Sequence, residues 1–136
     1  MSPFEELLMD TAQTLGWRLF HPAPVKDHRG NHRTAFRGHA GWPDLAIARR
    51  SVFLFREVKG KGDRMRPDQE VWGRHFLAAG LDWAIWHEGL RCNHSEVFPC
   101  VAGFDAILEE LNNPSGEYPR AVERPVRRAT ASQGAG

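Results

Sequence analysis

The spacing of apolar residues changes from helical to alternating within the first 21 positions, and a polar segment follows up to residue 41. Residues 3–15 place apolar side chains every three to four positions, with a serine–proline pair before them and a glycine after them, which predicts a capped helix. Residues 17–21 alternate and predict a short strand. Residues 22–41 are polar and rich in Pro, Gly, Asn and His, which predicts a long loop or an irregular hairpin with a short strand at residues 34–36.

The strongest pattern is a pair of apolar runs, residues 41–48 and 52–59, with a short polar break between them. Two such runs predict a β-hairpin, although the usual Asn-Gly turn is missing. With a two-residue turn at positions 50 and 51, counting outward places Asp44 directly opposite Glu57. Both faces of these strands are apolar, so the sheet is expected to be covered on both sides.

The second half of the chain continues this alternation. Pro67 begins a predicted helix that ends near residue 79, and residues 82–86 read as a buried strand. An irregular stretch follows, with a further short strand at residues 95–98, and then a helix over residues 102–111. The expected fold is therefore α/β, with a small mixed central sheet flanked by helices in the order αβββαβ.

Length and composition fit one folded domain with a tail. The 136 residues are 41% hydrophobic and 26% charged, which is ordinary for a soluble globular protein. We expect a domain over residues 1–112 and a disordered basic tail over residues 113–136, where Pro, Gly, Ser, Ala and Arg dominate. The sequence holds no bilayer-spanning apolar run and no signal peptide at its start, so an intracellular, cytoplasmic protein is expected.

Two cysteines give little indication of chemistry. Cys92 and Cys100 make no disulfide framework, and their spacing with His94 is not that of a standard zinc site. We therefore expect buried or free thiols.

The net charge of +1 conceals an uneven distribution. Residues 49–66 contain seven Arg or Lys against two acids, Glu57 and Asp63. Local positive charge around a carboxylate pair suits a polyanionic substrate. Scattered surface arginines are common, however, so charge alone does not identify a nucleic-acid-binding protein.

The opposed acids of the predicted hairpin carry most of the functional signal. Like charges directly opposite each other on neighbouring strands destabilise a sheet, so Asp44 and Glu57 require a cation. Lys59 lies two residues beyond Glu57 and therefore points to the same face. Duller interpretations exist for each residue: Asp44 as a turn cap, Glu57 and Lys59 as an exposed pair beside Arg56, and Gln69 as an ordinary first-turn residue. Jointly they need several coincidences, because a buried apolar strand rarely carries unpaired charges.

The same residues resemble a known nuclease signature. Pro43-Asp44, followed thirteen residues later by Glu57-x-Lys59, is similar to the PD-(D/E)xK motif. The fuller strings Gly-Trp-Pro-Asp-Leu, Glu-Val-Lys-Gly and Pro-Asp-Gln69 resemble the VRR-NUC branch of that superfamily over roughly residues 3–110. That branch includes stand-alone phage proteins and a domain of a DNA-repair enzyme, so the resemblance implies the cytoplasm of a bacterial or phage-infected host cell. The resemblance implies a restriction-endonuclease-like core and an activity like that of Holliday-junction resolvases.

The resemblance also implies roles for individual residues. Asp44, Glu57 and the backbone carbonyl of Val58 would ligate a divalent cation, and oxygen ligands suit Mg²⁺, with Mn²⁺ as a substitute. Lys59 would orient or help deprotonate the attacking water and stabilise the transition state. Gln69 would position Lys59 or that water from the first turn of its helix.

Members of such families usually add an acid from the first helix. Glu5 falls at the edge of the apolar stripe and Glu6 falls on its solvent side, so Glu5 is the preferred additional metal ligand. Further side chains are expected to contact nucleic acid because of their charge: Arg50, Lys61, Arg64, Arg66 and His21. For His21 a structural role is an equal alternative.

The expected activity is a Mg²⁺-dependent endonuclease that hydrolyses DNA phosphodiester bonds. Structure-selective cleavage of branched, flapped or junction DNA is favoured, because the chain has no room for a separate base-reading domain. Cutting both strands of a junction requires a homodimer. The alternative is a non-catalytic nucleic-acid-binding module that retains the nuclease fold.

Overall fold

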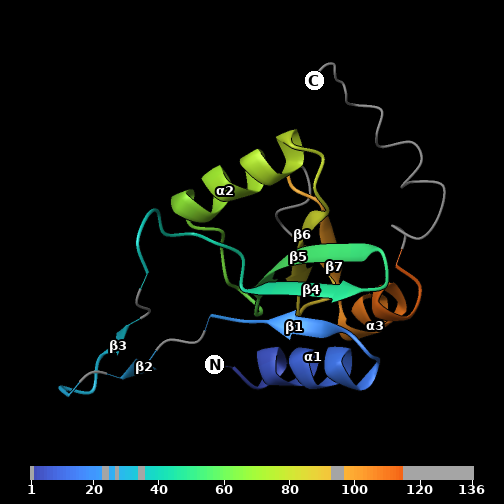
Figure 1. The fold of residues 1–136 in the computed structure, drawn as a ribbon, viewed down its shortest axis with the longest axis horizontal. Coiled ribbons are helices and arrows are strands. Elements are labelled where there is room, and N and C mark those ends of the chain that lie inside the picture. Colours follow the sequence, from blue (N-terminus) through green and yellow to red (C-terminus); the bar gives the residue numbers. More distant parts are fainter. Residues whose placement is uncertain (1, 23–24, 27, 34–35, 93–96, 115–136) are drawn as a thin grey trace.

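The computed structural model describes residues 2–22, 25–26, 28–33, 36–92 and 97–114 (Figure 1). These residues form three helices and seven strands, of which five strands build the main sheet and two build a small separate hairpin. The elements are α1 (Pro3–Thr14), β1 (Arg18–Phe20), β2 (Val25–Lys26), β3 (His32–Arg33), β4 (Leu45–Arg49), β5 (Val52–Lys59), α2 (Pro67–Ala78), β6 (Trp83–His87), β7 (Cys100–Ala102) and α3 (Phe104–Asn112).

The main sheet is mixed and has the strand order β1-β4-β5-β6-β7. β1, β4 and β5 are antiparallel to one another, whereas β5, β6 and β7 run parallel. Helices α1 and α3 cover one face of this sheet and α2 covers the other (Figure 1). The predicted α/β class with a small mixed sheet is confirmed. After the αβββαβ core, β7 is an added strand, and α3 is the helix predicted over residues 102–111.

The predicted hairpin register is also confirmed. Arg49 pairs with Val52 and Leu45 pairs with Arg56, so the next position outward sets Asp44 opposite Glu57. Alternation along β5 sends Leu54, Arg56 and Val58 to the side of α1 and α3, and sends Glu57 and Lys59 to the side of α2. The central strand therefore supplies charged side chains to both faces.

Two apolar clusters hold the layers together, as expected for a sheet that is covered twice. The side of α1 and α3 contains the larger cluster, which includes Leu8, Ile47, Leu54, Trp86 and Ile107. The side of α2 contains the smaller one, formed by Phe76, Trp83, Ile85 and Phe98.

The helix α2 packs closely on Trp83. A Cβ placed on Gly73 would lie 2.8 Å from ring atoms of Trp83, so a glycine is needed for this contact. The close packing fixes α2 over the sheet.

The two helices that carry predicted site residues, α1 and α2, begin where the sequence predicts. Ser2 and Glu5 form a reciprocal capping box at the start of α1, with Pro3 in its first turn. Pro67 begins α2, and Oε1 of Gln69 accepts a hydrogen bond of 2.9 Å from the backbone N–H of Arg66. Each helix therefore has a defined starting point.

Three predictions concern the connecting segments and the tail, and parts of them fall on residues outside the described ranges. The strand predicted at residues 95–98 is wrong in its described part, because Val97 and Phe98 lie in a turn and the strand is β7 instead. The long loop contains the hairpin β2–β3, and residues 34–35 of the alternative strand lie outside the described residues. Of the predicted tail, residues 115–136 lie outside them too.

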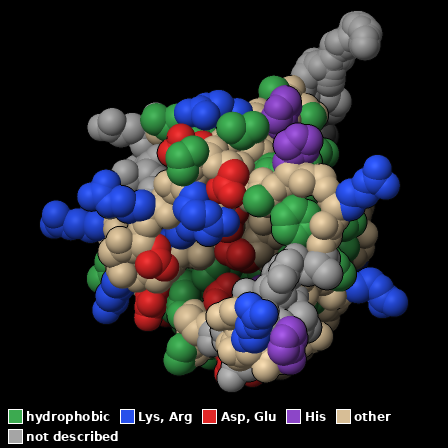
Figure 2. Space-filling model, turned by 90° about the vertical axis from the view of Figure 1, so that its left-hand side faces the viewer, with side chains coloured by type: hydrophobic (Ala, Val, Ile, Leu, Met, Phe, Trp, Pro, Cys, Tyr) green, Lys and Arg blue, Asp and Glu red, His purple; other side chains and the backbone are tan. Residues whose placement is uncertain are grey.

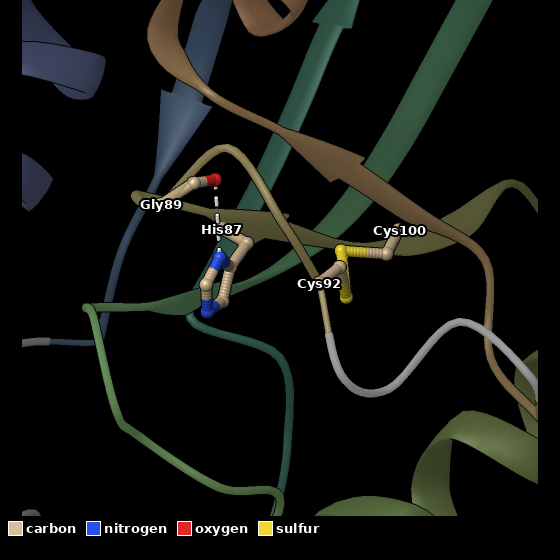
Figure 3. The surroundings of a disulfide bond; sticks show 4 residues. All are labelled: His87, Gly89, Cys92 and Cys100. Carbon is tan, nitrogen blue, oxygen red and sulfur yellow. Dashed lines mark hydrogen bonds between the residues drawn. A yellow bond between two sulfur atoms is a disulfide. The ribbon is translucent and has the colours of Figure 1, made fainter.

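The expectation of free thiols is also wrong, because Cys92 and Cys100 form a disulfide (Figure 3). Parallel pairing of β7 with β6 places Cys100 beside Ile85, and the chain that leaves β6 brings Cys92 back to it, with a Cα–Cα distance of 6.5 Å. This approach depends on sheet pairing and has no signal in the cysteine spacing. In the described part of the chain, no helix combines the length and the apolar character needed to cross a membrane.

Candidate active site

The predicted site residues meet where β4 begins, β5 ends and α2 begins. Asp44 immediately precedes β4, and Gln69 lies in the first turn of α2. Glu57 and Lys59 are among the last three residues of β5. Glu57, Lys59 and Gln69 are all buried, although each carries a polar or charged group. The structure thus brings together all four residues predicted to be catalytic.

The two acids are in direct contact. Oδ2 of Asp44 accepts a 2.8 Å hydrogen bond from the backbone N–H of Val58, which turns its carboxyl group toward β5. Burial, a hydrogen bond with Asp44 and the negative charge of Asp44 together raise the pKa of Glu57 from its ordinary 4.5 to about 10, although the charges of Lys59 and Arg66 act in the lowering direction. The pair therefore holds a proton or another positive charge.

Gln69 links Lys59 to Glu57. Its Oε1 accepts from Nζ of Lys59 at 2.7 Å and from the backbone N–H of Arg66 at 2.9 Å, and its Nε2 donates to Oε1 of Glu57 at 3.2 Å. The backbone N–H can only donate, so the orientation of the amide is fixed by this network. Gln69 is accordingly a positioning residue for both charged groups.

Two further residues hold Asp44 in place. Nδ1 of His21 lies 2.7 Å from the backbone oxygen of Asp44, and because that oxygen only accepts, Nδ1 carries the proton and donates. Gly41 has φ +101°, and a Cβ there would lie 2.4 Å from the backbone oxygen of Asp68. The loop before β4 can thus approach the start of α2 only with a glycine at this position.

An unsatisfied oxygen indicates what the pair lacks. Glu57 is fully buried, and no N–H or hydroxyl group of the described residues donates to its Oε2, so its contact with Asp44 needs a shared proton or a cation. An orphaned carboxylate oxygen beside a second carboxyl group fits a small cation with oxygen ligands. No group of three or more His, Cys, Asp or Glu side chains suited to a metal occurs in the described residues. The metal ligands that the resemblance implies, Asp44, Glu57 and the Val58 carbonyl, therefore stay a prediction.

The additional acid from α1 is placed near the site without joining that pair. Glu5 is half-buried and lines the same cavity as Asp44, while its Oε1 accepts from the backbone N–H of Ser2 at 3.1 Å. Glu6 is exposed on the outer side of α1. The structure thus separates the two glutamates as the helical spacing predicts, and the role of Glu5 as a ligand stays a prediction.

The predicted phosphate-contacting residues lie in two different places. Lys61, Arg64 and Arg66 are exposed in the segment that joins β5 to α2, and Arg66 lines the cavity beside Asp44. Arg50 lies in the β4–β5 turn, at the opposite end of the hairpin and more than about 15 Å along the strand from Asp44. Arg50 is therefore not part of the surface around the acids.

A cavity of about 790 Å³ opens beside the pair. Its walls come from α1, the end of β1, the loop over residues 36–42 and the start of α2. Figure 2 views this side of the molecule and shows acidic side chains near its centre with Lys and Arg side chains beside and around them. The arrangement of a recessed acidic pair within a basic rim admits an anion once the pair has bound a cation.

The structural role that the sequence left open for His21 is the one that its contact with Asp44 shows, whereas Gly41 and the Val58 N–H were not assigned these functions from the sequence. Only Gly41 has a local signal, since a glycine that ends a polar loop before Trp-Pro-Asp often marks an unusual backbone angle. The other two contacts connect residues 23 and 14 positions apart and depend on the fold.

Comparisons with protein-family models, with curated proteins and with solved structures found no significant match to this chain. The function of the site is therefore inferred from its own geometry.

Proposed function

We propose that the protein is a Mg²⁺-dependent endonuclease that hydrolyses DNA phosphodiester bonds. The observation that carries the proposal is the fully buried Glu57, which lies against Asp44 and whose Oε2 receives no hydrogen bond from an N–H or hydroxyl group of the described residues. A structural ion pair would have satisfied this oxygen, whereas a metal-binding carboxylate keeps it available.

Asp44, Glu57 and the Val58 carbonyl are the proposed ligands of Mg²⁺, with Mn²⁺ as a substitute. When bound, the ion supplies a Lewis acid that activates water and offsets the negative charge of the scissile phosphate. The Val58 N–H and the His21 imidazole keep Asp44 oriented toward β5. A preoriented carboxylate needs little rearrangement during the reaction.

Lys59 is the proposed group that orients the attacking water and stabilises the charge that develops on the phosphate. Gln69 holds Nζ of Lys59 at 2.7 Å and in this way limits the positions that the amine can adopt. Gln69 lies in the first turn of α2, and the N-terminus of this helix offers a favourable electrostatic field to a phosphate. Lys61, Arg64 and Arg66 add sequence-independent backbone contacts.

Structure-selective cleavage is the proposed mode, because the proposed contacts are made to the DNA backbone, which carries no base information. Cutting opposite strands of a four-way junction would need two copies of the chain, so a homodimer belongs to this version of the proposal.

Cleavage of supercoiled plasmid tests the proposal. The wild type is expected to nick DNA with Mg²⁺ and to stop with EDTA, and Asp44→Asn and Lys59→Met are expected to lower the rate about 100-fold or more. Asp10→Asn, an exposed acid on the outer side of α1, is the matched control and should retain the wild-type rate. Wild-type cleavage by Asp44→Asn would falsify the metal site, and DNA binding without any cleavage would favour the non-catalytic module.

A further inference from the structure

The cavity beside Asp44 presents aromatic side chains to solvent. Phe20 is 62% exposed, Phe36 is 59% exposed and Trp42 is 44% exposed, and all three line this one cavity. Single exposed aromatic residues are common on protein surfaces, but a concave group of them marks a binding site. The volume of about 790 Å³ lies within the usual range for sites that hold a small molecule or a nucleotide.

Trp42 is held rigidly although part of it is exposed. Its ring packs edge-to-face on Trp72, with centroids 5.0 Å apart at 81°, and against Phe76 at 5.3 Å and 62°. Trp72 in turn donates from Nε1 to the backbone oxygen of His39 at 3.3 Å, which ties α2 to the loop that forms the cavity wall. A fixed indole with an accessible surface is suited to stacking, because little side-chain freedom is lost on binding.

The charges of the same walls identify the class of ligand. Arg37 and Arg66 line the cavity together with the three aromatic residues, and Asp44 lies at its inner side. Aromatic faces combined with arginines are the usual means of binding unstacked bases and their phosphates. A purely apolar ligand would gain nothing from the charges of the two arginines.

We propose that this cavity binds one unpaired nucleobase next to the phosphate that is cut, so that the preferred substrate contains a single-stranded or frayed nucleotide. This inference rests on the proposed nuclease function for the position of the scissile phosphate. A base inside a duplex stacks on both sides and cannot reach such a cavity unless it leaves the helix. Flaps, fork junctions and single strands supply the unpaired base directly.

Equilibrium binding of two fluorescent probes in EDTA tests the proposal without cleavage. The probes are a thymidine oligonucleotide and a blunt duplex hairpin of equal charge. The wild type is expected to bind the single strand at least tenfold more tightly. Phe20→Ala and Phe36→Ala should each weaken single-strand binding about 5- to 100-fold and leave duplex binding unchanged.

Phe53→Ala is the matched control, because Phe53 is 54% exposed but does not line the cavity. It should bind both probes like the wild type. All three substituted rings are largely exposed, so the variants should unfold at nearly the wild-type temperature, and a thermal scan checks this.

A parallel cleavage assay with Mg²⁺ separates the two proposals. Cleavage by the wild type together with unchanged single-strand binding in Phe20→Ala and Phe36→Ala overturns the base-binding cavity and leaves the nuclease in place. Loss of single-strand binding in these variants, with no cleavage of any DNA by the wild type, supports the cavity and overturns the nuclease. Equal wild-type affinity for the two probes also overturns the cavity.

Discussion

Two buried charge clusters lie on opposite faces of β5, and they differ in how completely their groups are paired. On the side of α3, Arg56 directs all five of its N–H groups to acceptors in Phe55, Asp82 and Glu110 at 2.8–3.2 Å. Trp86 adds a 2.8 Å hydrogen bond to Glu110. On the side of α2, the positive groups near Asp44 and Glu57 do not pair both acids. Oε2 of Glu57 receives no hydrogen bond from an N–H or hydroxyl group of the described residues.

The difference teaches how burial can serve either stability or chemistry. Burial raises the pKa of Glu110, but the charge of Arg56 and hydrogen bonds from Arg56 and Trp86 outweigh it and lower this pKa below its ordinary value. At Glu57 burial and Asp44 act in the same direction, and the pKa rises. A satisfied cluster stabilises the fold, whereas an unsatisfied one is what the proposed cation site requires.

The largest effect is expected when the satisfied cluster is broken. Arg56→Met leaves Asp82 and Glu110 buried without their cation, so it should lower the free energy of unfolding by about 3–5 kcal/mol. Urea unfolding measures this change. Arg74→Met removes an exposed 3.6 Å ion pair with Glu70 and should lower that free energy by less than about 1 kcal/mol. Equal effects of the two variants would contradict the comparison.

A smaller loss is expected at the backbone contact that supports the unsatisfied cluster. Gly41→Ala places a Cβ 2.4 Å from the backbone oxygen of Asp68 and also strains a φ of +101°, so it should destabilise the fold by about 1–3 kcal/mol and displace Asp44. Gly38→Ala carries the same backbone strain, at φ +117°, with nothing within 4 Å. Thermal unfolding and plasmid nicking compare the two, and the contact is unimportant if they behave alike.

Neutralising the unsatisfied cluster should stabilise the metal-free protein. The pKa of Glu57 is about 10 in the folded state against an ordinary 4.5, so the folded state holds the proton more tightly and stability falls as pH rises between these values. Glu57→Gln removes this decline and should add about 1–2 kcal/mol near pH 8 in EDTA. The lowered pKa of Glu110 acts oppositely, because its contribution is present above pH 4.5 and lost as pH falls below it.

Unfolding temperatures measured from pH 5 to 9, with EDTA and with Mg²⁺, test this prediction. Mg²⁺ should stabilise the wild type more at higher pH, since binding displaces the shared proton, and should leave Glu57→Gln unchanged. A wild-type curve with no decline toward alkaline pH, or a variant that Mg²⁺ still stabilises, would count against the pair as a cation site.

The smallest effect on stability is expected on α1. Glu5→Gln keeps an acceptor for the Ser2 N–H but loses the charge, so unfolding should change by only a few tenths of a kcal/mol. If Glu5 completes the site, this variant lowers nicking about tenfold. Glu6→Gln, on the exposed side of the same helix turn, is the control. Equal nicking by the two variants removes Glu5 from the predicted site.

Local patterns in the sequence predict much of the candidate site. The period-2 alternation of two apolar runs defines the register that sets Asp44 beside Glu57, and proline at the first helical position defines where Gln69 lies. These signals involve residues that are close in the sequence, so they can be interpreted without knowledge of the fold.

The satisfied cluster could not be predicted in the same way. Arg56 reaches Asp82 and Glu110 across 26 and 54 residues, and nothing local distinguishes it from an exposed strand residue. The duller interpretation of Arg56 as a partner of Glu57 fails because adjacent strand residues point to opposite faces. The disulfide between Cys92 and Cys100 was missed for a related reason, since the parallel pairing of β6 and β7 creates it.

The adjacency of Arg56 and Glu57 also protects the alignment of the central strand. Sliding β5 one residue in one direction brings Glu57 to the place of Arg56, where three acids would gather without a cation. Sliding it in the other direction removes Arg56 from Asp82 and Glu110 and puts Phe55 among them. Two neighbouring residues of opposite sign thus penalise a shift of the strand register by one residue in either direction.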